Sequence, residues 1–454
     1  MDTLMMDNVL AQVRVALERD DLAGAAAVIE ALQPADQADL MEGLADADQV
    51  ALLSHLDPAD SADVLEEMED EEAAALAERL PLADLAGILD EMEADEAADV
   101  LGDLTPKLAA EALREMEEAE DVLHLLRYPD DTAGGLMTPA VVTLRRDWRA
   151  QKALQELRRT EPIADSVYYL FVTDAEGILK GVVGLRDLVV ASPETTIEAM
   201  MDPNVISVPV TADQEVCART LSRYGFLALP VVDEIDRLVG VITADDLIEV
   251  AEDEATEDMY RMVGIIGEEQ VWGPLSASVL KRLPWLAINM VTLFVAITVV
   301  DFFEPVIAGM VILAIFLPLV SGEGGNAGSQ TTTVIVRGIA LGEVDEHNGL
   351  RTLNKEFAAA LINGTLIGLG TGLAIYIWKG EWVIAVAVTL AMILNFLMAA
   401  LAGVLVPLGL KAVKVDPALA SAAFVTGITD TMGFLFFLGI ATLLMAAAAA
   451  YVGG

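Results

Sequence analysis

Acidic and apolar positions in residues 34–116 repeat at intervals of about 24 residues. Each repeat holds stretches of about eleven residues with Leu or Met on one helical face. Asp57-Pro58 and Thr105-Pro106 place a capping residue before a proline in the first turn of a helix. The pattern predicts an all-α superhelical array of short antiparallel pairs, with the acids on its solvated face.

The pattern changes after Pro129, where strand-like runs begin to alternate with helical ones. Residues 166–190 predict a strand, a turn, a second strand and a helix. Residues 226–250 repeat this order about 60 residues later. The two copies resemble a tandem pair of CBS domains, which are α/β modules that bind adenosyl ligands or act as hinges.

The second copy carries Thr243 and Asp246, the hydroxyl–carboxylate pair that such domains use on ribose and phosphate. The first copy has Gly184 and Asp187 at the matching positions, so a hydroxyl is missing. The resemblance therefore leaves two interpretations open: a nucleotide site that includes Asp187, Thr243 and Asp246, or a hinge that binds no ligand.

Long apolar runs dominate the chain beyond residue 280, and a run of about 18 residues is long enough to cross a bilayer. Positive residues gather at one side of these runs, which puts the N-terminal part in the cytoplasm and the C-terminus outside. The five predicted membrane helices are Leu283–Val300, Pro305–Val320, Phe357–Trp378, Trp382–Leu410 and Pro417–Val452.

Asp430 lies inside the last apolar run, with no basic residue near it in sequence. A carboxylate at membrane depth is costly unless it faces water, a cation or a polar partner. Asp430 therefore belongs either to a cation pathway or to a protonated pair with a neighbouring helix. Gly427 and Gly433 flank it and permit close helix approach or local unwinding.

Residues 318–330 form a second unusual stretch, because they hold four glycines among polar residues. Such a stretch cannot face lipid, and we expect a polar break within one long helix rather than an ordinary loop. Backbone carbonyls and Asn326 would then present oxygens to a water-lined constriction. Mg²⁺ keeps several waters and binds through few carboxylates, which suits one Asp and many neutral oxygens. The spans offer no Cys or His for softer metals.

The formal net charge is -46, and residues 1–280 carry -44 of it, from 18 basic and 62 acidic residues. This charge excludes nucleic acid as a partner and attracts cations. Adaptation to salt explains many of the acids equally well. The single Cys217 excludes an intrachain disulfide, and His55, His124 and His347 have no zinc spacing. The acidic and apolar parts meet near Trp272.

Acids are densest in the stretch that connects the second CBS-like copy to the apolar part. Asp246, Glu249, Asp253 and Glu257 follow helical spacing and so share one face. Their mutual repulsion must be relieved by solvent, by Arg or by divalent cations. No EF-hand loop is present in the sequence.

Taken in order, several motifs resemble the MgtE family of magnesium channels and transporters. The motifs are YPDDTAGGLMTP (128–139), ATED (255–258), PLVSGEGGNAGSQ (318–330) and DPALASAAFVTGITD (416–430). The resemblance implies a homodimer in the cell membrane, with a pore on the dimer axis that passes Mg²⁺ and closes when cytosolic Mg²⁺ bridges its acids. It also implies a multidomain membrane protein and not an enzyme. The implied parts are a helical domain (1–130), two CBS domains (131–195 and 196–255), a connecting plug helix (256–280) and a five-helix transmembrane domain (281–454).

The resemblance also implies roles for single residues. Asp430 matches the pore aspartate, and Asn326 with Gly324, Gly325 and Gly328 matches the pore-lining helix. Matching sensor acids for Mg²⁺ are Asp213, Glu215, Asp246, Glu249, Glu254, Glu257 and Asp258. In the helical repeat they are Asp95 and Asp99, where more than one register is permitted. Residues 221–226 contain no acid where the family offers a ligand.

Three functions stay open at this point. The first is a Mg²⁺-gated magnesium channel, with ATP as a further ligand of the CBS domains. The second is a transporter of another divalent cation, namely Co²⁺, Zn²⁺ or Ca²⁺. The third is a membrane-tethered sensor without transport. Ion flux in vesicles, with competition between cations, separates the three.

Overall fold

The computed structural model describes residues 3–117, 119–160, 168–267, 269, 271, 273–344, 348–419 and 422–452. It divides into two compact units, Met1–Ala251 and Glu252–Gly454. The predicted junction at Trp272 and the scattered His347 lie outside the described residues.

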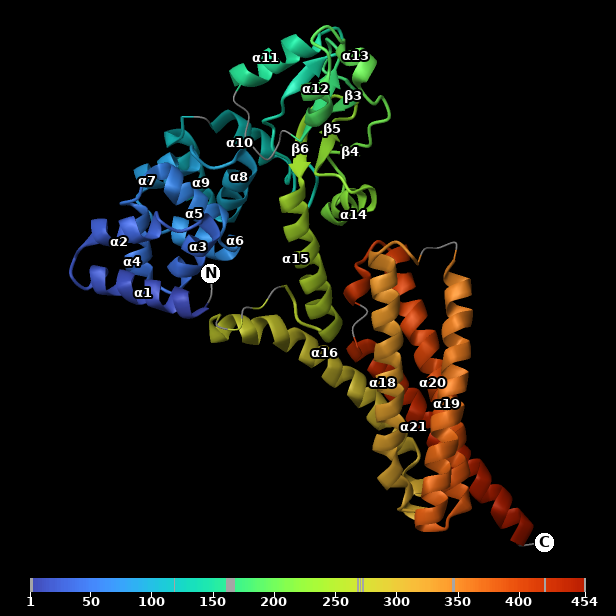
Figure 1. The fold of residues 1–454 in the computed structure, drawn as a ribbon. Helices are drawn as coiled ribbons and strands as arrows, with labels where there is room; N and C mark the ends of the chain where they lie inside the picture. The colour runs from blue at the N-terminus through green and yellow to red at the C-terminus, as the bar shows by residue number, and fades with distance from the viewer. Residues whose placement is uncertain are drawn as a thin grey trace. The chain divides into compact units, whose positions relative to one another are not determined.

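The first unit begins with an array of short helices, drawn from blue to cyan in Figure 1. Even-numbered helices stack on one another from α2 to α8, and odd-numbered ones from α3 to α9. Successive members of each row are about 24 residues apart, as the repeat predicts. The helices are α1 (Thr3–Leu17), α2 (Leu22–Ile29), α3 (Pro34–Glu42), α4 (Asp46–Leu53), α5 (Pro58–Glu66), α6 (Asp70–Ala77), α7 (Leu82–Leu89), α8 (Ala94–Asp103), α9 (Pro106–Glu115) and α10 (Ala119–Leu125).

Prolines start α3, α5 and α9, where a missing backbone N–H costs nothing. Asp57 and Thr105 stand at the N-cap positions of α5 and α9, but neither side chain bonds to the helix. Their predicted capping role is therefore corrected. Asp21, in contrast, does cap α2, because its Oδ1 accepts from the Gly24 amide at 2.9 Å.

Two three-stranded sheets follow, and they share one topology. In each, the first strand runs parallel to the second and the third is antiparallel to it. The strands are β1 (Thr143–Arg145), β2 (Tyr169–Thr173), β3 (Leu179–Gly184), β4 (Val208–Pro209), β5 (Ala228–Val232) and β6 (Leu238–Thr243). Their helices are α11 (Ala150–Thr160), α12 (Leu185–Val190), α13 (Ile197–Met200), α14 (Gln214–Tyr224) and α15 (Ala244–Val263).

Asp174 and Asp233 make equivalent turns in the two repeats. Each carboxylate accepts hydrogen bonds from backbone amides two and four residues later. The predicted order of strand, turn, strand and helix is thus present twice. The turns also pair, since the Leu179 amide bonds to the Asp236 carbonyl and the Leu238 amide to that of Gly177.

One hydrophobic core joins the helical array to the second repeat. It runs from the Leu and Met residues of α3–α8, through Ala133 and Met137, to Val231 and Leu247. The linking stretch is held by backbone bonds from Ala133 and Gly134 to residues just after β4. The array and the second repeat therefore form one folded body.

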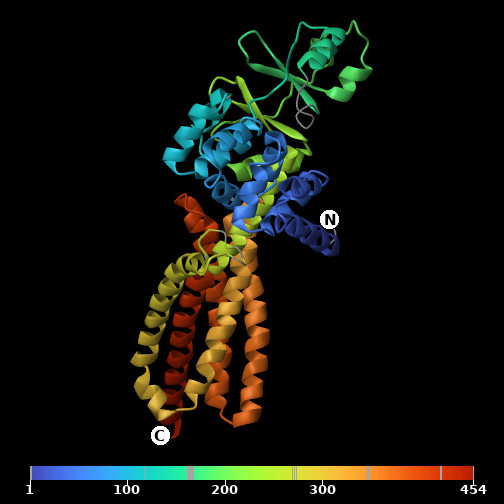
Figure 2. The same cartoon turned by 90° about the vertical axis from the view of Figure 1, so that its left-hand side faces the viewer.

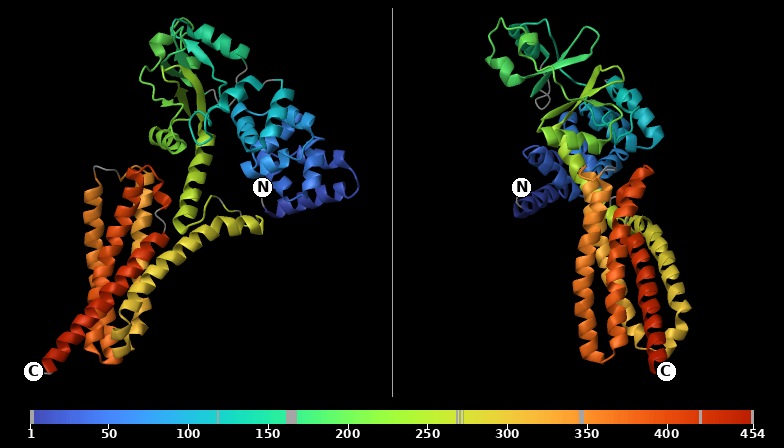
Figure 3. Two further views of the ribbon diagram at one scale, coloured as in Figure 1. Left: turned by 180° about the vertical axis from the view of Figure 1, so that it is seen from behind. Right: turned by 90° about the vertical axis from the view of Figure 1, so that its right-hand side faces the viewer.

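The second unit is a bundle of long helices (Figures 1, 2 and 3). α18, α20 and α21 pack on one another, α19 packs on α20, and α16 packs on α21. Four described segments are long and apolar enough to span a membrane: α16, α19, α20 and the stretch that contains α21. The helices are α16 (Leu275–Phe302), α17 (Glu304–Gly309), α18 (Leu313–Ala340), α19 (Gly349–Lys379), α20 (Trp382–Ala412), the short 3₁₀ turn η2 (Pro417–Leu419) and α21 (Ala422–Val452).

Two predicted boundaries differ from these bounds. The predicted second span at 305–320 is divided, because α17 ends at Gly309 and α18 begins at Leu313. α18 then continues through the polar stretch without a break. The predicted connecting helix at 256–280 is likewise not one helix. α15 begins inside the second repeat and ends at Val263, and α16 begins at Leu275.

Candidate ion pathway and acid clusters

Asp430 lies in the first third of α21 and is 6% exposed. The Ser321 hydroxyl of α18 donates a hydrogen bond of 2.6 Å to its Oδ1. The residue before it, Thr429, is fully buried and bonds back to the Thr426 carbonyl within α21. Asp430 thus has a polar partner on a neighbouring helix, which is the arrangement that a carboxylate at membrane depth requires.

Asn395 of α20 is a second buried polar group, and sequence reasoning missed it. Its Nδ2 donates to the Val320 carbonyl at 3.0 Å. Its Oδ1 is buried without a partner among the described residues. The sequence did contain a signal for it, because Asn395 is a polar side chain within an otherwise apolar run. Val320 and Ser321 are consecutive, so α20 and α21 both bond to α18 at the same level.

The glycines of the polar stretch lie on the packed side of α18. A Cβ on Gly324 would lie 2.0 Å from Asn395 Nδ2, and one on Gly328 would lie 2.5 Å from a Val425 methyl. Gly325 is also buried, with Thr426 next to it. These three glycines therefore serve close packing inside this chain, because any side chain would separate the helices.

Asn326 lies on a different side of α18. It is exposed, as are Gly322, Gln330 and Thr333, which follow at helical spacing. The predicted lining formed jointly by Asn326 and the three glycines is thus divided between two faces. A polar face on a membrane helix needs water or another protein surface, since lipid cannot satisfy it.

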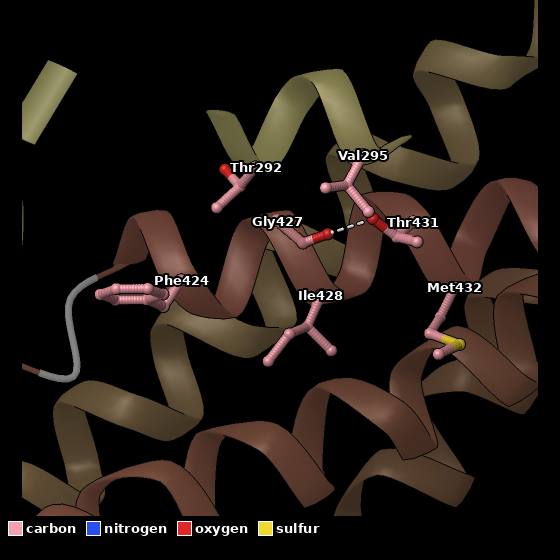
Figure 4. A pocket seen from close by; sticks show the side chains of 7 residues that line it. All are labelled: Thr292, Val295, Phe424, Gly427, Ile428, Thr431 and Met432. Carbon is pink, nitrogen blue, oxygen red and sulfur yellow. Dashed lines mark hydrogen bonds between the residues drawn. The ribbon is translucent and has the colours of Figure 1, made fainter. Parts of the chain in front are cut away.

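A hollow of about 240 Å³ lies on the other side of α21, against α16 (Figure 4). Its walls are apolar, and its two threonine hydroxyls already bond to carbonyls of their own helices. It offers no ligand for a cation. Its lining residues are Thr292, Val295, Phe424, Gly427, Ile428, Thr431 and Met432.

In the first unit, acids of α8 meet acids at the start of α15. Burial, and then the nearby Asp246, raise the pKa of Asp95 to about 8. Burial and Asp95 raise the pKa of Glu96 to about 9, and burial and Asp70 raise that of Asp99 to about 8. Glu249 adds further repulsion on Glu96. Sequence reasoning found Asp95, Asp99, Asp246 and Glu249. It missed Glu96 and Asp70, because only the packing of the helices shows that they lie near the others.

Asp95 is the most constrained member of this α8–α15 cluster. It is 7% exposed, and its Oδ1 has no partner in the described part of the chain. Asp246 is held instead by Thr243, whose hydroxyl and amide donate to Oδ2 at 2.6 and 3.1 Å. Among the described residues, no three acids, His or Cys stand in metal-ligating geometry. The cluster supplies negative charge and a buried acceptor, but not a preformed cage.

Other predicted sensor acids lie apart from this cluster. Asp213 caps α14, and its Oδ1 accepts from the Glu215 amide at 3.0 Å. Glu254, Glu257 and Asp258 belong to the second unit, near Asp416. Burial, and then Asp416, raise the pKa of Asp258 to about 6. The predicted acidic face of α15 is thus divided between two clusters.

The two α/β repeats bring aromatic rings together that sequence reasoning did not single out. Tyr169 meets Phe226 edge-on at 6.4 Å between ring centroids, and Tyr224 stacks on Phe226 at 5.5 Å. Asp187 is exposed at the start of α12, whereas Asp246 is occupied by Thr243. The signal was an aromatic residue at, or two residues before, the start of each copy's central strand.

Comparisons with known proteins cover nearly the whole chain. Residues 317–440 match the MgtE family model, described as a divalent cation transporter. Residues 32–131 match the MgtE intracellular N domain, and residues 133–194 and 197–253 match CBS domains. The helical domain, the tandem CBS pair and the apolar helices therefore correspond to the predicted fold class.

Similar curated proteins include the magnesium transporters MgtE of Thermus thermophilus and Enterococcus faecalis. They are 38% and 35% identical, over 72% of this chain and 73% and 72% of their own lengths. One similar structure is that of the cytosolic domain of the Mg²⁺ channel MgtE in complex with ATP. It has a TM-score of 0.51 at 37% identity, covering 53% of this chain and 99% of that one. The soluble part of a magnesium transporter has a TM-score of 0.50 at 33% identity, covering 55% and 99%.

Proposed function

Because this chain belongs to the MgtE family of divalent cation transporters, we propose that it is a magnesium channel gated by cytosolic Mg²⁺. The observation that carries the proposal is the buried Asp430, which is bonded to Ser321 beside the polar face of α18. Relatives are named magnesium transporters, and this chain pairs their fold with a carboxylate at membrane depth.

The pathway would form between two copies of the chain in the cell membrane. In a homodimer, the polar faces that carry Asn326 and Gln330 would meet and enclose water. Asp430 from each copy would attract a cation that keeps most of its hydration shell, which is how Mg²⁺ prefers to bind. The orientation that follows from the positive residues leaves the N-terminal unit in the cytoplasm and the C-terminus outside.

Gating would use the repulsion among the acids. At low cytosolic Mg²⁺, the carboxyl groups of the α8–α15 cluster lose their protons only at a cost in free energy, because they lie close together with little access to water. Mg²⁺ would bridge Asp95, Glu96 or Asp99 to Asp246 or Glu249. The acids Glu254, Glu257 and Asp258 near Asp416 would respond in the same way. Bridging favours one of two conformations and closes the pore.

We also propose that the CBS pair binds ATP, because a relative's cytosolic domain is named as an ATP complex. Tyr169 and Phe226 would stack on the base, and Asp187 would accept from the ribose. Phe226→Ala is expected to weaken ATP binding to the full-length protein, measured by calorimetry, whereas Tyr168→Ala on the neighbouring exposed ring serves as control. Equal affinity in both variants contradicts this assignment.

The pore proposal is tested by Mg²⁺ uptake into vesicles that contain the purified protein. Asp430→Asn keeps the shape and an acceptor for Ser321 but removes the charge. Flux should fall by at least about tenfold, since about 1.4 kcal/mol of lost ion stabilisation is a factor of ten. Ser321→Ala keeps the charge and should retain most of the flux.

Competition with Co²⁺, Zn²⁺ and Ca²⁺ in the same vesicles tests selectivity. If the protein prefers one of these ions to Mg²⁺, then that ion is its transported substrate. Undiminished flux in Asp430→Asn would remove this residue from the pathway. No cation flux from correctly assembled wild-type protein would support a sensor without transport.

A further inference from the structure

Arg261 lies in the last turn of α15 and reaches out to two acids. Its guanidinium pairs with Glu257, one turn earlier on the same helix, and with Asp416, which is 155 residues away in sequence. The Arg261 and Asp416 side chains are 32% and 29% exposed, so the pair is partly shielded from water. Arg261 thus bonds the end of α15 to the segment that precedes α21.

Asp416 is held firmly from its other side. Its Oδ1 accepts from the Ala418 amide at 2.7 Å, which fixes the carboxylate at the start of η2. Its Oδ2 takes the Arg261 guanidinium. η2 is the described element that precedes α21 in the chain, and α21 carries Asp430 fourteen residues after Asp416. A movement of α15 can therefore be transmitted through Arg261 and Asp416, and then along a short stretch of backbone, to the helix that carries the proposed pore residue.

A second contact supports the same connection. Gly264 follows α15 with φ +84°, and a Cβ there would lie 1.6 Å from the Trp285 ring of α16. Trp285 in turn meets Phe424 of α21 edge-on at 5.3 Å. Only glycine permits this close approach of backbone to ring. The end of α15 is thus fixed against both α16 and the first turn of α21.

The surroundings of Arg261 are strongly acidic. Burial, and then Asp416 and Glu254, raise the pKa of Asp258, whereas Arg261 and Arg337 lower it. Without Arg261, the carboxylates of α15 and Asp416 would repel one another across the contact. A partly shielded guanidinium that pairs with two acids offsets this repulsion at a fixed place.

We propose that Arg261 is a positioning residue, a tethered cation that holds the end of α15 on the segment leading into the Asp430 helix. It lets these acids stay together before any divalent ion arrives, and so it sets the Mg²⁺ concentration at which the channel closes. The inference rests on the proposed gating by Mg²⁺. The inference adds a second positive charge to that gating scheme. Besides the Mg²⁺ ion, which binds and leaves, the Arg261 guanidinium is a permanent cation on Glu257 and Asp416.

The test is Mg²⁺ flux in vesicles as a function of Mg²⁺ on the cytosolic side. Arg261→Gln should raise the concentration for half-closure about threefold, the size expected for one partly exposed ion pair. Arg261→Lys keeps the charge and should restore most of the sensitivity. Asp416→Asn should give a similar shift, since Asn can still accept from the Ala418 amide.

Combining Arg261→Gln with Asp416→Asn should add no further shift if the two act as a pair. Additive shifts would overturn the proposal, because each residue would then act through other partners. A shift in the opposite direction would also overturn it, since Arg261 would then compete with Mg²⁺ for the acids rather than hold them in place.

A second measurement keeps the proposal testable if no flux is found. Spin labels at Met259→Cys and Val413→Cys, both exposed positions, report the separation of α15 from the Asp416 segment. Labelled full-length protein is diluted with unlabelled protein so that distances within one chain are measured. Cys217 is buried and can stay. Without Mg²⁺, Arg261→Gln should lengthen or broaden this distance, and an unchanged distribution would overturn the inference whatever the cargo.

Discussion

Asp430 and Asn395 carry polar atoms into an apolar helix bundle, and each makes a hydrogen bond to the same level of α18. Asp430 accepts from the Ser321 hydroxyl, and Asn395 donates to the carbonyl of the preceding Val320. A buried polar group without a partner costs about 1–3 kcal/mol, so sliding α18 along its neighbours would break both bonds. These two contacts therefore fix the register of α18 against α20 and α21.

Gly324 and Gly322 offer a matched pair for testing this register. A Cβ at Gly324 would meet the buried and hydrogen-bonded Asn395 at 2.0 Å, whereas one at Gly322 would meet open space. Gly324→Ala should destabilise the protein by about 1–3 kcal/mol through overpacking. Gly322→Ala should stabilise it by about 0.5–1 kcal/mol, since alanine is the better helix former.

Thermal unfolding in detergent, followed by tryptophan fluorescence, should therefore show a lower midpoint for Gly324→Ala and an equal or higher one for Gly322→Ala. If the two variants melt alike, the close approach of α18 to Asn395 is not the packing constraint described above.

Single residues were predictable where their chemistry conflicts with their surroundings. Asp430 was found because a carboxylate is rare in an apolar run. Its partner Ser321 and the neighbouring Asn395 were not, because the register between helices is set by tertiary packing. The three glycines were assigned to a lining for the same reason. The sequence indicates that these positions require small residues, but it does not indicate which neighbouring helix packs against them.

At the scale of elements, periodicity carried most of the information. The repeat of about 24 residues and the two strand–turn–strand–helix copies appear as predicted, because the spacing of buried positions depends on the local backbone. The predicted break in the helix at 318–330 was wrong. It rested on the low helix propensity of glycine and polar residues alone. Packing on α20 and α21 overrides that propensity and keeps α18 continuous.

α15 shows how one helix can serve two clusters. Its acids share one face in sequence, yet Asp246 and Glu249 lie near α8, whereas Glu257 and Asp258 lie near Asp416. Helical spacing predicts which acids share a face of α15. It does not predict which residues of other elements lie next to each part of that face. Arg261 was likewise not singled out by the sequence pattern, because its partner Asp416 is distant in sequence.

For the whole molecule, the central question is whether the net charge of -46 acts through defined sites or only through screening. Most acids on the helical array are exposed, as expected of a solvated face. Asp95, which is buried, and the half-buried Glu96 and Asp99 differ, since burial and then neighbouring acids raise the pKa of each to about 8 or 9. Deprotonation of these carboxyl groups lowers the stability of the folded state. A bound divalent cation would offset this loss.

The pH dependence of stability separates these alternatives. In the unfolded chain these acids lose their protons near pH 4, whereas in the folded chain they keep them to about pH 8 or 9. Between those values the folded state binds more protons. The free energy of unfolding should therefore fall as pH rises from about 4 to 8, by up to about 1.4 kcal/mol per pH unit for each proton held. Below about pH 4 both states are protonated, and this contribution is fully retained.

Urea unfolding of the N-terminal fragment 1–263, which contains the whole first compact unit, measures this slope at pH 5 and pH 8. Millimolar Mg²⁺ should raise stability at pH 8 far more than at pH 5, because only the charged carboxylates bind it. Asp95→Asn should flatten the slope and weaken the Mg²⁺ response, whereas Asp39→Asn at an exposed position of α3 should change neither. If NaCl at equal ionic strength stabilises the fragment as well as Mg²⁺ does, the acids act by screening, and gating through this cluster is contradicted.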